Sequence, residues 1–274
     1  MTKQIKQPSS DLISRLDVAI RAAHAAGEIL RDGFQTGMIA FGTKSNRNDV
    51  VTEFDLRADR AIADIITTAY PDDGMLSEES GQTAGAQQGQ WVVDPLDGTN
   101  NFSQNIPHFG VSIAFCDGHV PLISCIHDPI CNETFTAIRD AGAKRNQASL
   151  STSSQQTLGG AFLCAGTSTQ PALRETLHQQ MPPFLRAARA LRTTGSAALD
   201  LAYVAAGRFD AMWYPELSWW DVAAGILLIE EAGGRCTDYC GKTLAGMTSS
   251  AVASNGILHN AILKLVKDGC HGQP

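Results

Sequence analysis

Apolar residues recur at helical spacing in two stretches near the start of the chain. In residues 11–32, leucine and alanine side chains repeat every three or four positions, and Gly33 follows as the expected C-cap. In the second stretch Ile62 and Ile66 share one face, and Pro71 marks its end because proline cannot continue a helix. The pattern predicts two helices separated by a loop rich in glycine, asparagine and lysine.

The next part of the chain carries short apolar runs that are separated by turn residues. A polar loop over residues 80–90 precedes the run WVVD, which has the length and composition of a strand. Three further runs follow at residues 109–116, 120–128 and 133–138. Their close spacing predicts neighbouring antiparallel strands of one sheet.

From about residue 150 the pattern changes to strands that alternate with helices. Strands are expected at 161–166, 191–195, 210–214, 235–240 and 249–255, and helices near 171–180, at 196–207, at 220–234 and at the C-terminal end. An antiparallel half followed by an alternating half predicts an α+β fold of layered sheets and helices. We expect a single catalytic unit over residues 1–274, with an α+β half (1–149) and an α/β half (150–274).

Composition narrows the class of protein. At 43% apolar and 18% charged residues the chain is ordinary globular material, and its apolar stretches are too short for a membrane helix. The N-terminus lacks the apolar core of a secretory signal, so the cytoplasm is the expected compartment. The formal charge of −7 argues against a nucleic-acid partner. The odd number of cysteines, seven, favours reduced, buried thiols.

The segment WVVDPLDGTNNF carries the most informative chemistry. An apolar strand delivers Asp94 to its end, Pro95 prevents further ladder pairing, and the chain turns before Asp97. Two carboxylates three positions apart can converge on Mg²⁺, which prefers oxygen ligands. The amides of Gly98 and Thr99 can hold an anion, especially if a helix begins there. The alternative is an Asp-Gly surface turn, but the apolar residues on both sides predict burial.

Three other acidic segments are ambiguous alone. Glu78 in SEES is equally typical of a solvated loop, and Thr52 with Asp55 fits a helix capping box. Asp221 stands where an N-cap belongs, before a long apolar helix. Small residues at 223–225 predict that this helix packs closely on a neighbour.

The combination and order of these segments resemble one enzyme family. DVVTEFD, SEES, DPLDGTNNF and WDVAAG with the trailing EEAGG are similar to the motifs of the inositol monophosphatase family of magnesium-dependent, lithium-sensitive phosphatases. The resemblance covers nearly the whole chain. It implies a layered αβαβα sandwich of the sugar-phosphatase type, a homodimer, and Mg²⁺-dependent hydrolysis of a small sugar or polyol phosphate by direct attack of a metal-activated water.

The resemblance also assigns roles by position. One Mg²⁺ would be held by Glu78, Asp94 and the carbonyl of Leu96; a second by Asp94, Asp97 and Asp221; and a third, weaker one by Glu78 and water. These assignments place most metal ligands in residues 1–149. Carboxylates gathered in this way imply bound cations, because two unit charges roughly 4 Å apart repel by about 4 kcal/mol at an effective dielectric constant of 20.

The remaining catalytic roles follow from the same resemblance. Thr99 and Asp55 match the pair that orients and deprotonates the attacking water, with Glu78 beside them. The amides of Gly98 and Thr99 match a phosphate cradle. Lys44 matches a lysine near the third metal, although a solvated loop lysine is an equal alternative.

The substrate remains open. Inositol enzymes carry a glutamate seven residues before the aspartate of the WD motif, and here that position is Tyr214, with Glu216 two residues later. Arg192 and Ser196, with Asp200, are expected near the substrate end of the site, or else form an ion pair and a helix cap. Alternatives within the family are histidinol-phosphate phosphatase, fructose-1,6-bisphosphatase and the phosphatase of adenosine 3′,5′-bisphosphate. A non-catalytic homologue that binds metal or a partner is the alternative outside it.

Overall fold

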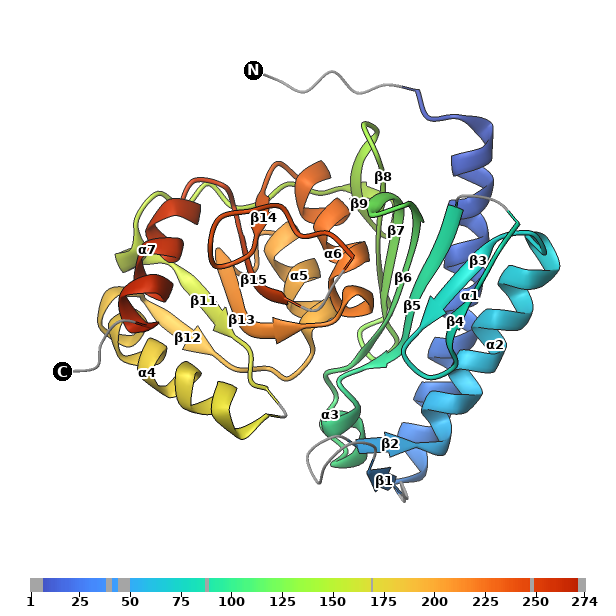
Figure 1. Ribbon diagram of the computed structural model, residues 1–274, viewed down its shortest axis with the longest axis horizontal. Coiled ribbons are helices and arrows are strands. Elements are labelled where there is room, and N and C mark those ends of the chain that lie inside the picture. The colour runs from blue at the N-terminus through green and yellow to red at the C-terminus, as the bar shows by residue number, and fades with distance from the viewer. Residues whose placement is uncertain are drawn as a thin grey trace.

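Helices and sheets alternate as layers in the computed structural model, which describes residues 7–37, 41–43, 50–86, 89–168, 170–246 and 249–270. The helices are α1 (Ser10–Thr36), α2 (Glu53–Ala69), α3 (Thr99–Ser103), α4 (Pro171–Ala187), α5 (Ala197–Ala205), α6 (Trp219–Glu231) and α7 (His259–Cys270), with a 3-10 turn η1 (Leu158–Gly160). The pair α1 and α2 covers one sheet, α5 and α6 lie between the two sheets, and α4 and α7 cover the other (Figure 1). The expected αβαβα sandwich is confirmed.

The first sheet has eight strands in the order β10-β9-β8-β7-β6-β5-β3-β4. These strands are β3 (Gly74–Ser77), β4 (Gly81–Thr83), β5 (Gly89–Asp97), β6 (Gly110–Asp117), β7 (Val120–Asp128), β8 (Glu133–Ile138), β9 (Gly142–Arg145) and β10 (Ala148–Ser149). Neighbours are antiparallel except β3 and β5, which run parallel. The predicted run of neighbouring antiparallel strands is confirmed in β6, β7 and β8.

The second sheet has five strands in the order β12-β11-β13-β15-β14. These strands are β11 (Phe162–Ala165), β12 (Ala190–Arg192), β13 (Ala211–Leu217), β14 (Arg235–Thr237) and β15 (Ser249–Ser254). β11 runs parallel to both of its neighbours, whereas β15 is antiparallel to β13 and β14. The alternation of strands and helices expected after residue 150 therefore builds a mixed sheet.

A small hairpin that was not predicted leads into α2. Its strands β1 (Phe41–Thr43) and β2 (Val50–Thr52) pair antiparallel, and Thr52 ends the hairpin as the N-cap of α2. The Thr52 side chain accepts from the Phe54 amide at 3.2 Å, while Asp55 reaches back to the Thr52 amide at 2.8 Å. The predicted capping box is confirmed, and it fixes the orientation of Asp55.

Small residues let α1 lie close to the first sheet. Ala19, Ala22, Ala23 and Ala26 are all fully buried, and α1 contacts both α2 and β7. At Gly27 a Cβ atom would lie only 2.6 Å from a ring carbon of His127 on β7, so no larger residue fits without a shift. The apolar stripe therefore sets how deeply this helix sits on the sheet.

The helix α6 is buried between the two sheets. It contacts strands of both sheets as well as α5. At Gly225 a Cβ atom would lie 2.4 Å from Leu201 on α5, which confirms the predicted close packing of residues 223–225. Each fully buried leucine or isoleucine of such a helix contributes about 1.5–3 kcal/mol, so this layer holds Asp221 firmly in place.

Two local predictions were wrong. Gly33 does not end α1, which continues to a left-handed C-cap at Gly37 with φ +66°. Gly33 is instead a packing position, because a Cβ atom there would lie 2.4 Å from the Phe54 ring. The polar stretch 80–90 is not all loop, since it contains β4 and the first residues of β5.

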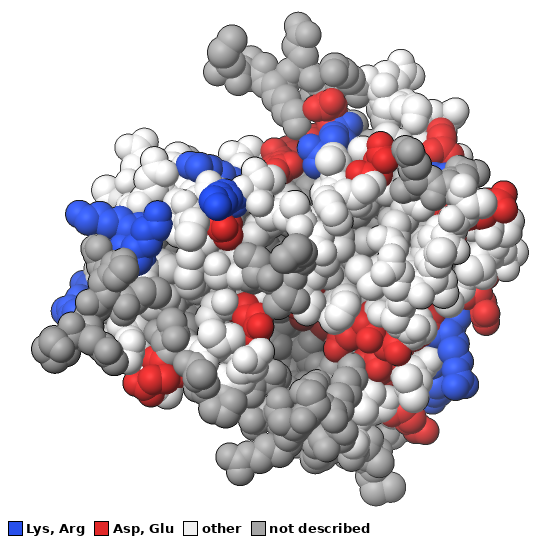
Figure 2. All heavy atoms as spheres, in the orientation of Figure 1, with Lys and Arg blue, Asp and Glu red and all other residues white. Residues whose placement is uncertain are grey.

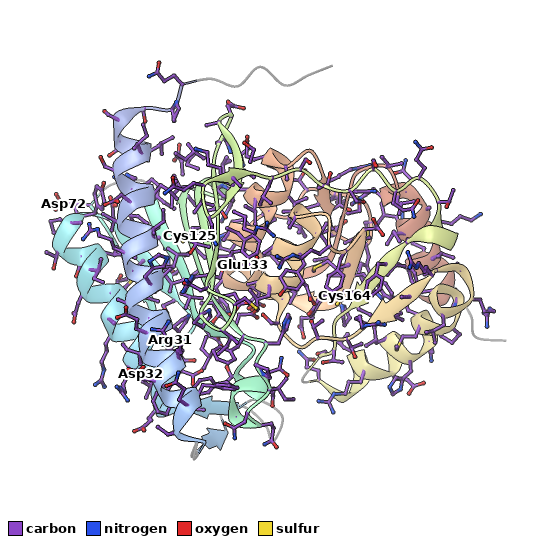
Figure 3. All side chains as sticks on the ribbon, turned by 180° about the vertical axis from the view of Figure 1, so that it is seen from behind. Arg31, Asp32, Asp72, Cys125, Glu133 and Cys164 are labelled. Carbon is purple, nitrogen blue, oxygen red and sulfur yellow. The ribbon has the colours of Figure 1, made fainter. Side chains whose placement is uncertain are left out.

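The cysteines divide between buried and exposed positions. Cys125 lies on the first sheet and Cys164 on the second, and both are buried with free thiols (Figure 3). Cys131 and Cys240 are exposed, contrary to prediction. No helix in the described part of the chain combines the length and the apolar character needed to cross a membrane.

Candidate active site

A bulge near the end of β5 presents the first two carboxylates. β5 pairs with β6 as far as Asp94, the register then shifts, and pairing resumes where Asp97 lies opposite Gly110. The prediction that Pro95 ends the pairing was wrong, because the bulge accommodates the residue without an N–H. The Leu96 amide donates to Asp94 at 3.0 Å across this bulge. Asp94 and Asp97 are both buried.

Asp97 joins the first half of the chain to α5. Its carboxylate accepts from the amides of Ala197 at 3.2 Å and Ala198 at 2.8 Å, and from the hydroxyl of Ser196. The positive end of the helix and three donors favour the ionised form of this carboxyl. Ser196 also caps α5 by accepting from the Leu199 amide at 3.4 Å, and its side chain is fully buried.

Asp221 enters the site from the first turn of α6. The helix begins at Trp219 with Ser218 as its N-cap, so the alternative that Asp221 is itself the cap does not hold. Asp221 lies three residues further on, and its carboxylate accepts from the Ser218 amide at 2.7 Å. The carboxylate is therefore held by backbone within one helical turn.

These three aspartates form a compact cluster. One carboxylate oxygen from each of Asp94, Asp97 and Asp221 lies within 4.8 Å of the others, and no other such group of His, Cys, Asp or Glu occurs among the described residues. Burial raises the pKa of Asp94 well above its usual range, and the charges of Glu78, Asp97 and Asp221 add to this effect. Burial likewise raises the pKa of Asp97 to about 6, against the lowering effect of its donors.

The cluster thus has the chemistry of a divalent-cation site. Its donors are all carboxylate oxygens, the ligands that Mg²⁺ prefers. Without a cation, ionisation of one aspartate opposes ionisation of the next, because the groups are buried and close. Glu78 follows β3, its amide donates to Val93 at 3.1 Å, and its charge is felt at Asp94.

Thr99 connects the cluster to Asp55. Its hydroxyl lies 3.1 Å from Asp55 Oδ1 and 3.0 Å from the Leu96 carbonyl oxygen, and its single proton serves one of them at a time. The other oxygen of Asp55 accepts from the amide and hydroxyl of Thr52, at 2.8 and 2.5 Å. The buried carboxylate of Asp55 therefore contacts the Thr99 hydroxyl, close in sequence to Asp94 and Asp97.

Gly98 makes the turn between these groups possible. It has φ +97°, in the region that favours glycine, and a Cβ atom would lie 3.1 Å from the His108 carbonyl oxygen. The short helix α3 begins directly after it, at Thr99, as the sequence suggested. A left-handed turn at Gly98 thus leads directly into α3, and the phosphate cradle at Gly98 and Thr99 stays a prediction.

A hollow of about 410 Å³ extends from the aspartates toward the second sheet. Its lining includes Asp97 and Asp221 from the aspartate cluster, and Thr167, Ser168 and Arg174 from the segment that joins β11 to α4 and from α4 itself. Figure 2 shows acidic side chains on both sides of a depression in the lower middle of the molecule. The aspartates thus open into a space large enough for a small molecule.

Tyr214 lines this hollow, but its hydroxyl is bound to Asp200. The Tyr214 hydroxyl donates to Asp200 at 2.7 Å, and Thr194 and Cys164 donate to the same carboxylate at 2.6 and 3.0 Å. Asp200 is fully buried, which raises its pKa, and burial also raises the pKa of Tyr214. At Gly166 a Cβ atom would overlap the tyrosine ring at 1.8 Å, so this glycine makes room for it.

The other substrate residues expected from sequence lie elsewhere. Glu216 accepts from the Gln170 side chain at 2.8 and 3.1 Å, and the guanidinium of Arg192 lies over the Phe162 ring at 4.8 Å. Neither is among the residues that line the hollow. Lys44 lies outside the described residues.

The structure adds Arg174, which the sequence did not single out. It lies in the first turns of α4, lines the hollow, and donates from Nε to the Ser168 carbonyl at 2.7 Å. The buried donors of Asp200 were missed as well. No motif surrounds Arg174, so only its position in space could reveal it.

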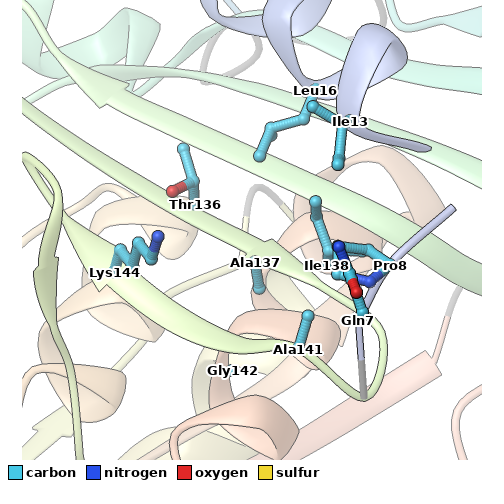
Figure 4. A pocket seen from close by; sticks show the side chains of 10 residues that line it. All are labelled: Gln7, Pro8, Ile13, Leu16, Thr136, Ala137, Ile138, Ala141, Gly142 and Lys144. Carbon is cyan, nitrogen blue, oxygen red and sulfur yellow. The ribbon is translucent and has the colours of Figure 1, made fainter. Parts of the chain in front are cut away.

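A larger hollow of about 500 Å³ lies between the start of α1 and the β8–β9 hairpin (Figure 4). Its lining includes the apolar side chains of Ile13, Leu16 and Ile138. Ile138 is the last residue of β8, and through β7 and β6 it is in register with the start of β5, whereas Asp94 lies toward the other end of β5. This hollow contains none of the clustered carboxylates, so it is not part of the candidate active site.

Comparisons with known proteins agree with this geometry. A model described as the inositol monophosphatase family matches residues 11–270. The chain is 40% identical over 255 residues to the Nus factor SuhB of Salmonella typhimurium, which covers 92% of this chain and 96% of that relative. The Nus factor SuhB of Escherichia coli is 39% identical over the same shares of the two chains.

Solved structures show the same architecture. The extragenic suppressor protein suhB from Bartonella henselae matches with a TM-score of 0.89 at 35% identity, over 93% of this chain and 99% of that chain. The Thermotoga maritima IMPase matches with a TM-score of 0.87 at 31% identity, over 93% and 98% of the two chains. The inositol monophosphatase from Anabaena matches with a TM-score of 0.83 at 33% identity, over 94% and 97%.

Proposed function

The chain belongs to the inositol monophosphatase family, and from this premise we propose that it is a Mg²⁺-dependent phosphomonoesterase that acts on a small sugar or polyol phosphate. The observation that carries the proposal is one local arrangement. Asp94 and Asp97 are buried and form a cluster with Asp221. Leu96 links this cluster to the hydrogen bond between Thr99 and Asp55, because its amide donates to Asp94 and its carbonyl oxygen lies 3.0 Å from the Thr99 hydroxyl.

The residues present fit divalent cations. In the proposal, Glu78, Asp94 and the Leu96 carbonyl would hold one Mg²⁺. A second would be held by Asp94, Asp97 and Asp221, and a third by Glu78 and water. The raised pKa of Asp94, caused by burial and by neighbouring carboxylates, supports this fit because a cation removes both penalties. When bound, the cations supply charge neutralisation at the phosphate and lower the pKa of water.

The chain's own residues position and deprotonate the attacking water. With its proton directed to Asp55, the Thr99 hydroxyl offers a lone pair that accepts a proton from water, and Asp55 takes the proton that Thr99 releases. The bonds from Thr52 hold Asp55 in the orientation that this relay requires. In the proposal the amides at Gly98 and Thr99 hold the phosphate, and because water attacks it directly, no covalent phosphoenzyme forms.

The choice of substrate is a separate proposal. Tyr214 stands where inositol enzymes carry a glutamate, and its hydroxyl is bound to Asp200 rather than directed to the substrate. This favours a broad inositol monophosphatase-like activity, with histidinol phosphate, fructose 1,6-bisphosphate and adenosine 3′,5′-bisphosphate as alternatives. Homodimer formation and lithium sensitivity complete the proposal as expectations from the family, and a cytoplasmic location as an expectation from the N-terminal sequence.

The decisive experiment measures phosphate release with and without Mg²⁺ from inositol 1-phosphate and the three alternative substrates. We expect Mg²⁺-dependent turnover of at least one, and its loss in Asp94→Asn. A metal-loaded, folded protein that released phosphate from none of these, nor from a generic aryl phosphate, would contradict the proposal.

The names of the curated relatives favour a second function. The Nus factor SuhB proteins are named for a role other than hydrolysis, one that points to transcription. We propose that this chain serves a similar role beside catalysis, and the expectation of no nucleic-acid partner stays a prediction from charge. A host that depends on its own SuhB separates the roles: growth supported equally by this chain and by its Asp94→Asn variant favours the non-catalytic one. If neither protein supports growth, this chain does not perform the non-catalytic role in that host.

A further inference from the structure

The hollow beside the aspartates would receive the part of the substrate that follows the scissile phosphate. What this part can be depends on the groups that line the hollow away from Asp97 and Asp221. The inference below rests on the proposed phosphatase function, because it assumes that the phosphate lies at the aspartate end.

Tyr214 supplies no carboxylate at the position where the inositol enzymes place one. The Tyr214 hydroxyl is used by Asp200, which already accepts from Thr194 and Cys164. The Glu216 carboxylate, two residues on, accepts from the Gln170 side chain and does not line the hollow. Recognition of a polyol through a carboxylate at this position is therefore absent from the described residues.

Arg174 instead supplies a positive charge. It is the one Lys or Arg among the described residues that line the hollow, and its side chain is partly buried. The bond from Nε to the Ser168 carbonyl at 2.7 Å fixes the guanidinium at the wall. Ser168 is in turn buried, and its hydroxyl accepts from the Gln170 amide at 3.0 Å. A planar guanidinium held in this way suits a phosphate or carboxylate, which it can bind through paired N–H groups.

We infer that the substrate carries a second anionic group, a phosphate or a carboxylate, at the end remote from the scissile phosphate, and that Arg174 binds it. Arg174 thereby takes over the selective role that a glutamate has in the inositol enzymes, with the opposite charge preference. A neutral polyol monophosphate is then a weaker substrate than the same scaffold with a second anion.

Matched substrates test this inference. We would compare kcat/KM for fructose 1-phosphate with that for fructose 1,6-bisphosphate, and for glycerol 2-phosphate with that for 2-phosphoglycerate, which replaces a hydroxymethyl group by a carboxylate. We expect the member with the second anionic group to be preferred roughly tenfold or more in at least one pair, the range of a charge-assisted hydrogen bond. The pair that shows the preference identifies the anion as phosphate or carboxylate.

Variants assign the preference to Arg174. Arg174→Gln should bring the ratio close to one, mainly through KM, and Arg174→Lys should retain part of it because the charge remains. Arg186→Gln is the matched control, since it removes the same charge from an exposed position of the same helix. We expect its ratio to equal that of the wild type.

The outcomes separate the two proposals. Turnover of fructose 1-phosphate without a preference in either pair would overturn this inference and leave the phosphatase intact. An unchanged ratio in both folded Arg174 variants would overturn it as well. If the protein hydrolysed none of the phosphate esters, both the proposed function and this inference would be overturned.

Discussion

Two walls of the same hollow are built on different principles. The acid wall comprises Asp97 and Asp221, which line the hollow, and Asp94, which clusters with them. It is held by backbone amides at element ends: the β5 bulge and the first turns of α5 and α6. The distal wall (Thr167, Ser168 and Arg174) belongs to β11's exit and the start of α4, and Arg174 contacts a carbonyl six residues away. Backbone thus positions the groups for chemistry, while side chains of one later segment form the recognition surface.

The difference has a mechanical meaning. Bulges and helix starts are over-determined by sheet pairing and helical hydrogen bonds, so the acid wall cannot shift without loss of secondary structure. The distal wall can change its side chains without such loss. Changes to the acid wall should therefore act on the chemical step, and changes to the distal wall on the choice of substrate.

The largest effect is expected for Asp94→Asn. The substitution keeps the size of the side chain but removes a charge that two proposed cation sites share. Loss of several kcal/mol of transition-state stabilisation corresponds to a fall in kcat of roughly a thousandfold or more. Steady-state kinetics and calorimetric Mg²⁺ titration measure both losses.

Asp128→Asn is the matched control for that substitution. Asp128 is also a buried aspartate at a strand end of the first sheet, and one of its oxygens accepts from the amides of Ile130 at 2.9 Å and Cys131 at 2.8 Å. An asparagine keeps that acceptor, so Mg²⁺ affinity should be unchanged. If Asp94→Asn and Asp128→Asn lost kcat and Mg²⁺ affinity equally, Asp94 would not be a specific cation ligand.

A smaller effect is expected when Thr99 loses its hydroxyl. Thr99→Ala removes the group that contacts both Asp55 and the Leu96 carbonyl, and kcat should fall roughly a hundredfold or more, as for the loss of a proton-transfer group. Thr99→Ser keeps the hydroxyl and should retain most of the activity. If the alanine variant matched the serine variant, the proposed relay would be wrong. Pre-steady-state measurement of phosphate release distinguishes the chemical step from product release.

The sequence revealed the acid wall because its geometry is local. Asp94 and Asp97 share one turn, and Asp221 lies in the first turn of its helix. The position of Asp55 is also local, because its capping box joins residues three positions apart. Strand and helix periods also predicted the layers. The end of a helix was harder to predict. Gly33 and Gly37 are equally suitable as the C-cap of α1 in the sequence, and only the packing of Gly33 against Phe54 decides between them.

The distal wall was not predictable for the opposite reason. Arg174 has the sequence surroundings of any surface arginine in a helix, whereas the family resemblance placed Arg192 near the substrate end of the site. Contacts over long separations decided the matter, since Arg192 lies against Phe162 and Tyr214 meets Asp200. A one-dimensional pattern does not contain such contacts.

Next in size is the pH dependence of metal-free stability. Folding raises the pKa of Asp97 from its usual value near 4 to about 6, mainly through burial, and raises that of Asp94 further. The unfolded chain releases these protons first, so stability falls as pH rises from about 4 through 6 and the loss is complete above the folded pKa. A shift of two pKa units corresponds to roughly 3 kcal/mol.

Mg²⁺ should oppose this loss, because it binds the ionised carboxylates of the folded state. The measurement is the difference in Tm with Mg²⁺ and with a chelator across this pH range, expected to be small at low pH and to increase above pH 6. Burial lowers the pKa values of His127 and His259 to about 4, which makes stability rise with pH instead. Their contribution is the same in both solutions and cancels in the difference. A difference that was flat with pH would contradict the placement of the cation at the aspartates.

The smallest effect sharpens the comparison most, because it concerns a residue that contacts no proposed ligand. Thr52→Ala removes the hydroxyl that accepts from the Phe54 amide as N-cap of α2 and that donates to Asp55, and it should lower the free energy of unfolding by about 1 kcal/mol. Ser9→Ala removes the N-cap of α1, where the side chain accepts from Leu12 at 3.3 Å, and should lower stability similarly. Only the first should reduce kcat, roughly several-fold, because a displaced Asp55 receives the proton from Thr99 less well. Denaturant unfolding and kcat measured on the same samples separate the two effects. Equal kcat in both variants would mean that the Thr52 cap stabilises α2 but does not help to position Asp55 for catalysis.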